Sequence, residues 1–174
     1  MAGNLVQVSR ATSTGSSASL KVTGIDSSNA YVVFFSIKPV DNDKDLYIRV
    51  TTSGTADSDS EYDYTSVFFR ADASFSNGNA ANNDKWGSSN SAMENDTAKW
   101  CNANLWLFNF NESSEYSYMT IHTCGWNDTV QSVSDAGGGV HTVQEANDGI
   151  ELTWESASNF ASGSELVLFK VEGS

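Results

Sequence analysis

The sequence is poor in the residues that catalysis, metal binding and cross-linking use most often. It has 2 cysteines, 2 histidines and 1 proline among 174 residues, and 9 Lys and Arg against 22 Asp and Glu. The net charge of -13 argues against a nucleic-acid partner, because phosphate backbones repel an acidic surface. No apolar run approaches the roughly 20 residues of a membrane helix. The N-terminus, MAGNLVQVSR, lacks the features of a Sec signal, so we expect synthesis in a cytosol or export by another route.

Motifs of the common enzyme classes are missing as well. The sequence has no GxSxG nucleophile elbow, no HExxH zinc motif, no phosphate-binding glycine loop and no CxxC pair. Acidic residues are so numerous that no glycosidase pair can be picked out. We therefore predict no catalytic residue, no cofactor and no metal site.

Two acidic series come nearest to a metal-binding pattern. Asp41, Asp43 and Asp45 have the spacing that opens an EF-hand loop, but Leu46 and Thr52 occupy its glycine and glutamate positions. A solvated turn is the better interpretation. The second series takes every other position from Asp57 to Asp63, through Asp59 and Glu61. Charges on one face of a strand edge block unwanted strand pairing, which we prefer to the alternative of a calcium site.

The histidines and cysteines are expected to have no special role. His122 and His141 are too few for a metal site unless carboxylates join them, and each is expected on a strand face without a catalytic duty. Cys101 and Cys124 fall in or beside predicted neighbouring strands, but sequence does not give the distance between them. In a protein folded in a cytosol, we expect two buried free thiols.

The segment Tyr31–Val50 gives the clearest structural signal. Tyr31–Ile37 is almost continuously apolar and rich in aromatic and β-branched residues, which predicts a strand that is covered on both faces or central in a sheet. Pro39 ends this strand, because proline cannot donate to a strand ladder. A polar turn follows, and Leu46–Val50 then alternates as a half-buried strand does.

Similar short segments, separated by turn residues, occupy most of the chain. They are Asn4–Val8, Leu20–Ile25, Tyr62–Arg70, Asn104–Phe110, Glu115–Cys124, Val140–Val143, Gly149–Glu155 and Glu165–Val171. We expect Gly137–Gly139 to break the chain before Val140. Together with the two strands of Tyr31–Val50, these short segments without a long helix predict an all-β fold, namely a single-domain antiparallel β-sandwich of jelly-roll type.

Two polar stretches lie outside this pattern. Residues 1–19 are interpreted as a short strand and a polar arm, ahead of a sandwich domain over residues 20–174. Ala11–Ser19 is too small and polar to build a core, so we expect it to stay mobile unless a neighbour orders it. Asp72–Ala98 is expected to be a long loop, with weak support for a helical turn over Ala92–Trp100.

Three apolar residues in or near loops are candidate partner-binding residues: Trp86, Met93 and Trp126. An exposed tryptophan can stack on a sugar or fill a pocket of a partner protein. The alternative is that each tryptophan folds back onto its own loop.

Several of these segments together resemble small virion proteins of tailed bacteriophages, of the type common in marine phages and cyanophages. The resemblance rests on Thr23-Gly24-Ile25-Asp26-Ser27-Ser28, on Phe35-Ser36-Ile37-Lys38-Pro39 followed by Asp41, Leu46 and Arg49, and on Ser158-Asn159-Phe160-Ala161-Ser162-Gly163-Ser164-Glu165-Leu166-Val167-Leu168-Phe169. It covers both ends and the Tyr31–Val50 segment, in order. Between about Asp72 and Gly138 the chain matches only in having strands and a long loop.

The resemblance implies a structural virion protein without enzymatic activity, assembled in the bacterial cytoplasm. A capsid decoration or cement protein on the capsid exterior is the preferred hypothesis, with sister subunits and other virion proteins as partners and a homo-oligomeric state. A tail-associated or tail-fibre receptor-binding protein that contacts host surface glycan is the alternative. A sugar-active enzyme on a jelly roll ranks below both, and the fold alone does not decide among them. Neither nucleic acid nor a membrane is expected as a partner.

Overall fold

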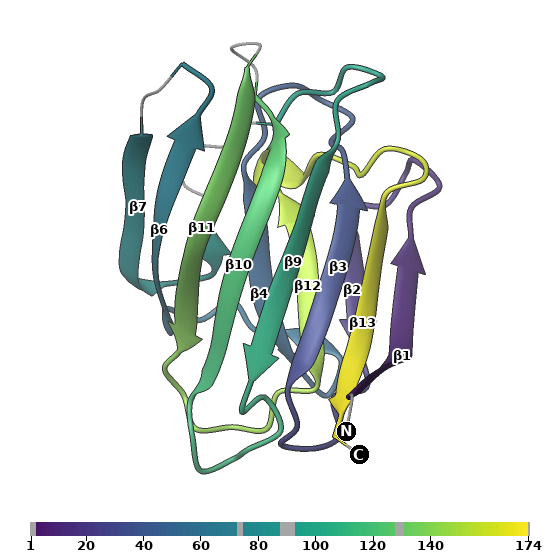
Figure 1. The fold of residues 1–174 in the computed structure, drawn as a ribbon. Coiled ribbons are helices and arrows are strands. Elements are labelled where there is room, and N and C mark those ends of the chain that lie inside the picture. Colours follow the sequence, from purple (N-terminus) through teal and green to yellow (C-terminus); the bar gives the residue numbers. More distant parts are fainter. Residues whose placement is uncertain (1–2, 73–74, 88–92, 128–130, 174) are drawn as a thin grey trace.

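The computed structural model describes residues 3–72, 75–87, 93–127 and 131–173, which form two antiparallel β-sheets packed face to face. The larger sheet has eight strands in the order β1-β13-β3-β9-β10-β11-β6-β7 and lies at the front of Figure 1. These strands are β1 (Asn4–Thr12), β3 (Tyr31–Ile37), β6 (Tyr62–Arg70), β7 (Phe75–Asn83), β9 (Cys101–Phe108), β10 (Ser117–Trp126), β11 (Ser132–His141) and β13 (Glu165–Glu172).

The smaller sheet has five strands and lies behind the larger one in Figure 1. It contains β2 (Ser19–Thr23), β4 (Leu46–Thr52), β5 (Thr55–Ala56), β8 (Trp86–Gly87) and β12 (Gly149–Trp154). A single 3-10 turn, Glu155–Ala157, is the one helical element in the described part of the chain. No helix there is long and apolar enough to cross a membrane. The predicted all-β antiparallel sandwich of jelly-roll type is thus confirmed.

Period-two alternation builds the core between the sheets. In β10, buried residues such as Met119 and Ile121 alternate with exposed ones, and in β4, Leu46, Ile48 and Val50 are buried on one side. The inward side chains of both sheets meet in one apolar cluster. Burial of such side chains is the main stabilising contribution to a fold of this kind.

The Tyr31–Val50 segment connects the two sheets. β3 lies between β13 and β9 in the larger sheet, so the predicted central strand is confirmed. β4 pairs with β12 in the smaller sheet. The turn between them therefore crosses from one layer to the other, and Pro39 at its start is buried and bridges Phe160.

Two predictions about irregular segments are wrong. The predicted long loop Asp72–Ala98 contains β7, which pairs with β6, and the short strand β8, which pairs with β4. Residues 88–92 lie outside the described residues, and the described residues 93–100 contain no helix. Gly137–Gly139 does not break the chain but lies inside β11. Glycine is needed at these strand positions because neighbouring atoms leave no room for a side chain: a Cβ on Gly137 would come 2.5 Å from Ser66 Cβ.

The polar arm predicted for Ala11–Ser19 also folds against its own chain. β1 extends to Thr12 and pairs with β13 along its length. Beyond β1, Ser13 is buried, and its amide donates to the carbonyl of Ser164 at 2.8 Å. Its hydroxyl donates to the carbonyl of Phe160 at 2.8 Å. Backbone and side-chain hydrogen bonds order this segment, and Ala11 packs against the core.

Candidate functional site

Trp86 and Met93, two of the three predicted partner-binding residues, are buried in the protein's own core. Trp86 is 0% exposed and contacts Tyr62 edge to face, with ring centroids 5.3 Å apart. Its indole Nε1 donates to the carbonyl of Val140 at 3.1 Å. Met93 is 2% exposed and bridges the backbones of Lys44 and Asn127. The prediction that these two side chains meet a partner is wrong, since β8 places Trp86 between the sheets.

Trp126, the third predicted residue, lies at the end of β10 and is half-buried. The Lys99 ammonium lies 5.8 Å from its ring centroid. Part of its surface therefore stays accessible, and its contact with a partner remains a prediction.

The exposed aromatic residues gather elsewhere, on the solvent-facing side of the larger sheet. We call the outward side of β3, β9, β10 and β11 the outer face. Cross-strand register places Trp106 beside Val32 and Thr120, and Tyr118 beside Phe108. Further exposed aromatic residues on this side of the sheet are Phe34 on β3, Phe69 on β6 and Phe75 on β7. Exposed aromatic residues that neighbour one another across β3, β9 and β10 are typical of an interaction surface.

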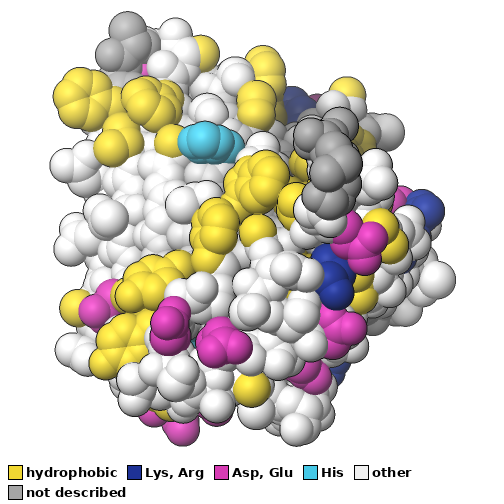
Figure 2. Space-filling model, turned by 60° about the horizontal axis from the view of Figure 1, so that its bottom comes forward, with side chains coloured by type: hydrophobic (Ala, Val, Ile, Leu, Met, Phe, Trp, Pro, Cys, Tyr) yellow, Lys and Arg dark blue, Asp and Glu magenta, His cyan; other side chains and the backbone are white. Residues whose placement is uncertain are grey.

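The outer face carries no Asp, Glu, Lys or Arg at any outward position of its four strands. The polar residues among them are neutral amides and hydroxyls, with His122 near the centre and Cys124 beside Asn102. Figure 2 shows hydrophobic side chains at the upper left, the centre and the lower left of the molecule, and acidic side chains mainly in the lower and right-hand parts of the view. In a chain with net charge -13, this is a marked segregation of charge.

Shallow hollows mark the outer face where small residues interrupt the aromatic ones. One of about 570 Å³ lies over Gly138 and Tyr118 and extends beyond the outer face onto β6 and β7, where Asp63 and Asn79 line it. Another of about 330 Å³ is lined by Asn102, Asn104 and His122. Both are open to solvent, so they can receive side chains or sugar rings from a flat partner but do not enclose a small molecule.

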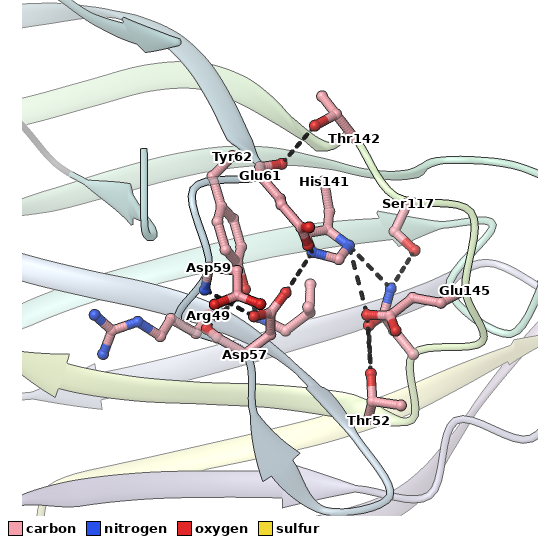
Figure 3. A network of polar contacts seen from close by, with 12 residues as sticks. Arg49, Thr52, Asp57, Asp59, Glu61, Tyr62, Ser117, His141, Thr142 and Glu145 are labelled. Atoms are coloured by element: carbon pink, nitrogen blue, oxygen red, sulfur yellow. Dashed lines mark hydrogen bonds and ion pairs between the residues drawn. The ribbon is translucent and has the colours of Figure 1, made fainter. Parts of the chain in front are cut away.

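A separate polar cluster surrounds His141 at the end of β11 (Figure 3). The imidazole is 0% exposed. Its Nε2 lies 2.8 Å from Asp57 Oδ2 and 3.5 Å from Glu61 Oε2. Its Nδ1 lies 3.9 Å from Glu145 Oε1 and 3.5 Å from the Asn147 amide nitrogen. Carboxylates therefore do join one of the two histidines, which the sequence alone did not indicate.

The pKa values of the two carboxyl groups nearest to His141 Nε2, those of Asp57 and Glu61, are shifted in opposite directions. Burial acts to raise the pKa of Asp57, but hydrogen bonds from the Asp59 amide and from His141 lower it overall. Burial and the charge of Asp57 raise the pKa of Glu61. The two groups thus share one imidazole, and Asp57 is the better acceptor.

The cysteines and the second acidic series are placed only partly as predicted. Both thiols are free, and Cys101 is buried, but Cys124 is exposed on the outer face, so the prediction of two buried thiols is wrong for Cys124. Alternation along the two strands points them to opposite sides of the sheet. In the acidic series, Asp57 and Asp59 lie before β6 in the turn after β5, so they do not form a charged strand edge.

Comparison with protein-family models and with curated protein sequences gave no match. Among solved structures, the galectin LEC-6 of Caenorhabditis elegans matches with a TM-score of 0.35 and 12% sequence identity, over 94% of this chain and 96% of that chain. A similarity of this degree carries no argument about function.

Proposed function

We propose that this chain is a non-enzymatic structural protein of a bacteriophage virion, a capsid decoration protein that assembles with copies of itself through the outer face. The observation that carries the proposal is the uncharged, aromatic outer face in an otherwise acidic chain. The sequence resemblance to small virion proteins of tailed bacteriophages is the reason for proposing that this assembly is part of a virion.

Charge favours a second copy as the occupant of this face. Two chains of net charge -13 repel each other wherever their acidic surfaces meet. The outer face avoids this repulsion because neither copy brings a charge to it. The smaller sheet offers no such surface, since Lys21, Glu151 and Arg49 follow one another across its strands.

Self-association gives the first test. Sedimentation velocity of the purified protein at increasing concentration should show reversible association. Trp106→Ser should weaken it by about thirtyfold or more, the typical effect of removing a central tryptophan anchor. Val40→Ser is the matched control, because Val40 is similarly exposed, at 43% against 39%, but follows β3 in a loop. A monomer at every concentration, or equal effects of both variants, would refute assembly through this face.

Copy number in the particle gives the second test. Quantitative mass spectrometry of purified virions should find the chain in hundreds of copies if it decorates the capsid. A dozen or fewer copies would favour a tail position instead, and its absence from particles would refute the virion proposal.

A glycan-binding tail protein is the second candidate function. The outer face sets the rings of Phe34 and His122 beside the amide of Asn104, and rings and planar amides suit neutral sugars by stacking and by hydrogen bonding. This candidate predicts that the wild-type protein binds neutral glycans on an array and that Asn104→Ala abolishes this binding. Wild-type protein that binds no glycan would exclude it.

A further inference from the structure

The cluster around His141 holds more negative charge than its one imidazole can balance. Asp57, Glu61 and Glu145 approach its ring nitrogens, and Asp59 is adjacent to the first two. Across the described residues, every ion pair that Lys or Arg forms goes to some other carboxylate. Like charges held this close repel each other unless a cation or a proton lies between them.

The imidazole distinguishes this cluster from the other acidic turn of the chain. The Asp41–Asp45 turn is largely exposed and has no nitrogen donor, whereas His141 is fully buried and directs Nε2 toward Asp57 and Glu61. Figure 3 shows that Asp57, Asp59 and Glu61 come from one segment and that His141 approaches it from β11. Oxygens of these three carboxylates lie within 4.8 Å of one another.

We propose that His141 Nε2, Asp57 and Glu61 form a binding site for a divalent zinc ion, with the carboxylate of Asp59 close to those of Asp57 and Glu61. Zinc binds imidazole nitrogen and carboxylate oxygen at about 2.0–2.2 Å, so two donors of a tetrahedral site lie about 3.3 Å apart. The 3.5 Å between His141 Nε2 and Glu61 Oε2 fits that spacing. The 2.8 Å to Asp57 Oδ2 is a hydrogen-bond distance and opens by about 0.5 Å when the ion replaces the shared proton.

The other side of the imidazole is built to support this ligation. A metal-bound imidazole keeps its remaining proton on the other ring nitrogen and gives it to a nearby carboxylate or carbonyl. His141 loses the Nε2 proton on binding and carries one on Nδ1 instead. Glu145 Oε1 is 3.9 Å from Nδ1, so it must approach by about 1 Å to accept this proton, and the 3.5 Å contact between Nδ1 and the Asn147 amide nitrogen is given up. Glu145 is itself held by Thr52, whose hydroxyl donates to the same oxygen at 3.0 Å. Glu145 thus acts as a positioning residue.

Zinc fits these donors better than calcium does. Calcium takes oxygen ligands, whereas a buried imidazole nitrogen is a donor that zinc prefers. The ion would also have a structural effect. Asp57 directly follows β5 in the smaller sheet, while Glu61 precedes β6 and His141 ends β11 in the larger one. One ion would therefore tie the two sheets together at this end of the sandwich.

Isothermal titration calorimetry of chelator-treated protein with zinc chloride tests the site. We expect one ion per chain with a Kd of about 10 µM or lower at neutral pH, and weaker binding of calcium chloride. Glu61→Gln should weaken zinc binding by about tenfold or more, and Glu145→Gln by about tenfold, through loss of a ligand and of its support. Asp63→Asn is the matched control: it continues the same series and removes the same charge, but its carboxylate accepts from the Asn82 amide instead. Its zinc affinity should stay within about twofold of wild type.

Substitution of His141 is not used as the test, because the side chain is buried and its loss would affect folding. Nitrogen NMR of the two histidines in the wild-type protein reports ligation by His141 instead. Zinc should shift the Nε2 resonance of His141 and leave His122 unchanged. No zinc binding below about 100 µM would overturn the site. Equal losses in Glu61→Gln and Asp63→Asn, or an unmoved His141 resonance, would also overturn it, because they would mean that the ion binds only to diffuse negative charge.

Discussion

The close approach of Trp86 to the glycines of β11 yields the most direct test of the packing. A Cβ placed on Gly139 would lie 2.6 Å from both Cδ1 and Nε1 of Trp86 and 3.0 Å from the carbonyl oxygen of Asp63. Real atoms do not come this close, so either the indole or the strand must move. Overpacking of this kind costs about 1–3 kcal/mol, whereas replacing a strand glycine by alanine returns about 0.5–1 kcal/mol of chain entropy. Because three atoms lie within 3.0 Å of the new Cβ, the overpacking cost is expected in the upper part of its range, at about 2–3 kcal/mol, which leaves a net loss of about 1–2 kcal/mol for Gly139→Ala.

Thermal and urea unfolding measure this loss. For a chain of this size it corresponds to a fall in Tm of roughly 2–8 °C. Gly173→Ala is the control, because a Cβ there meets nothing within 4 Å. A Gly139→Ala protein as stable as this control would refute the packing argument.

A double-mutant cycle tests the cause of the loss. Trp86→Ala removes both indole atoms that the new Cβ would strike, although by itself it destabilises the protein through lost packing and the lost hydrogen bond to Val140. If the indole is the obstacle, Gly139→Ala should cost less in the Trp86→Ala background, with a coupling of about 1 kcal/mol. Costs that add within about 0.5 kcal/mol would show that the clash lies with the backbone of Asp63.

Two further predictions concern single side chains. Thiol titration of the unreduced protein should find Cys124 reactive in the native state and Cys101 reactive only after unfolding. The reason is that burial raises the pKa of Cys101 to about 12 and shields its sulfur. A native protein with no reactive thiol would contradict this prediction. Burial and the charge of Glu155 raise the pKa of Asp45 to about 6 in the folded protein. The stabilisation that protonated Asp45 provides is therefore fully present below pH 3.8, the ordinary pKa of an aspartate, and is lost as the pH rises through 6. Asp45→Asn should therefore raise Tm relative to wild type at about pH 7 but not at about pH 4, and equal effects at both values would contradict the assignment.

Local sequence determined most strands and the fold class. Alternation and β-branched content are properties of a few consecutive residues, so Tyr31–Ile37, Tyr62–Arg70 and Glu165–Val171 were predicted nearly to their observed bounds. β7 was missed because its sequence, FSNGNAANN, has almost no apolar alternation and is held as a strand by pairing with β6.

The tertiary structure alone decided which residues meet across the sequence. Trp86 is buried because β8 inserts it between the sheets beside glycines more than fifty residues away, and that proximity leaves no local signal. The outer face likewise exists only once β3, β9, β10 and β11 lie side by side, when the aromatic residues that β3, β9 and β10 point outward meet on one surface. His141 and Asp57 are separated by 84 positions and meet only because β11 pairs with β6. The spacing of apolar residues predicts which side chains share a face of one strand. Which strands lie next to each other, and in what register, depends on the packing of the whole sandwich.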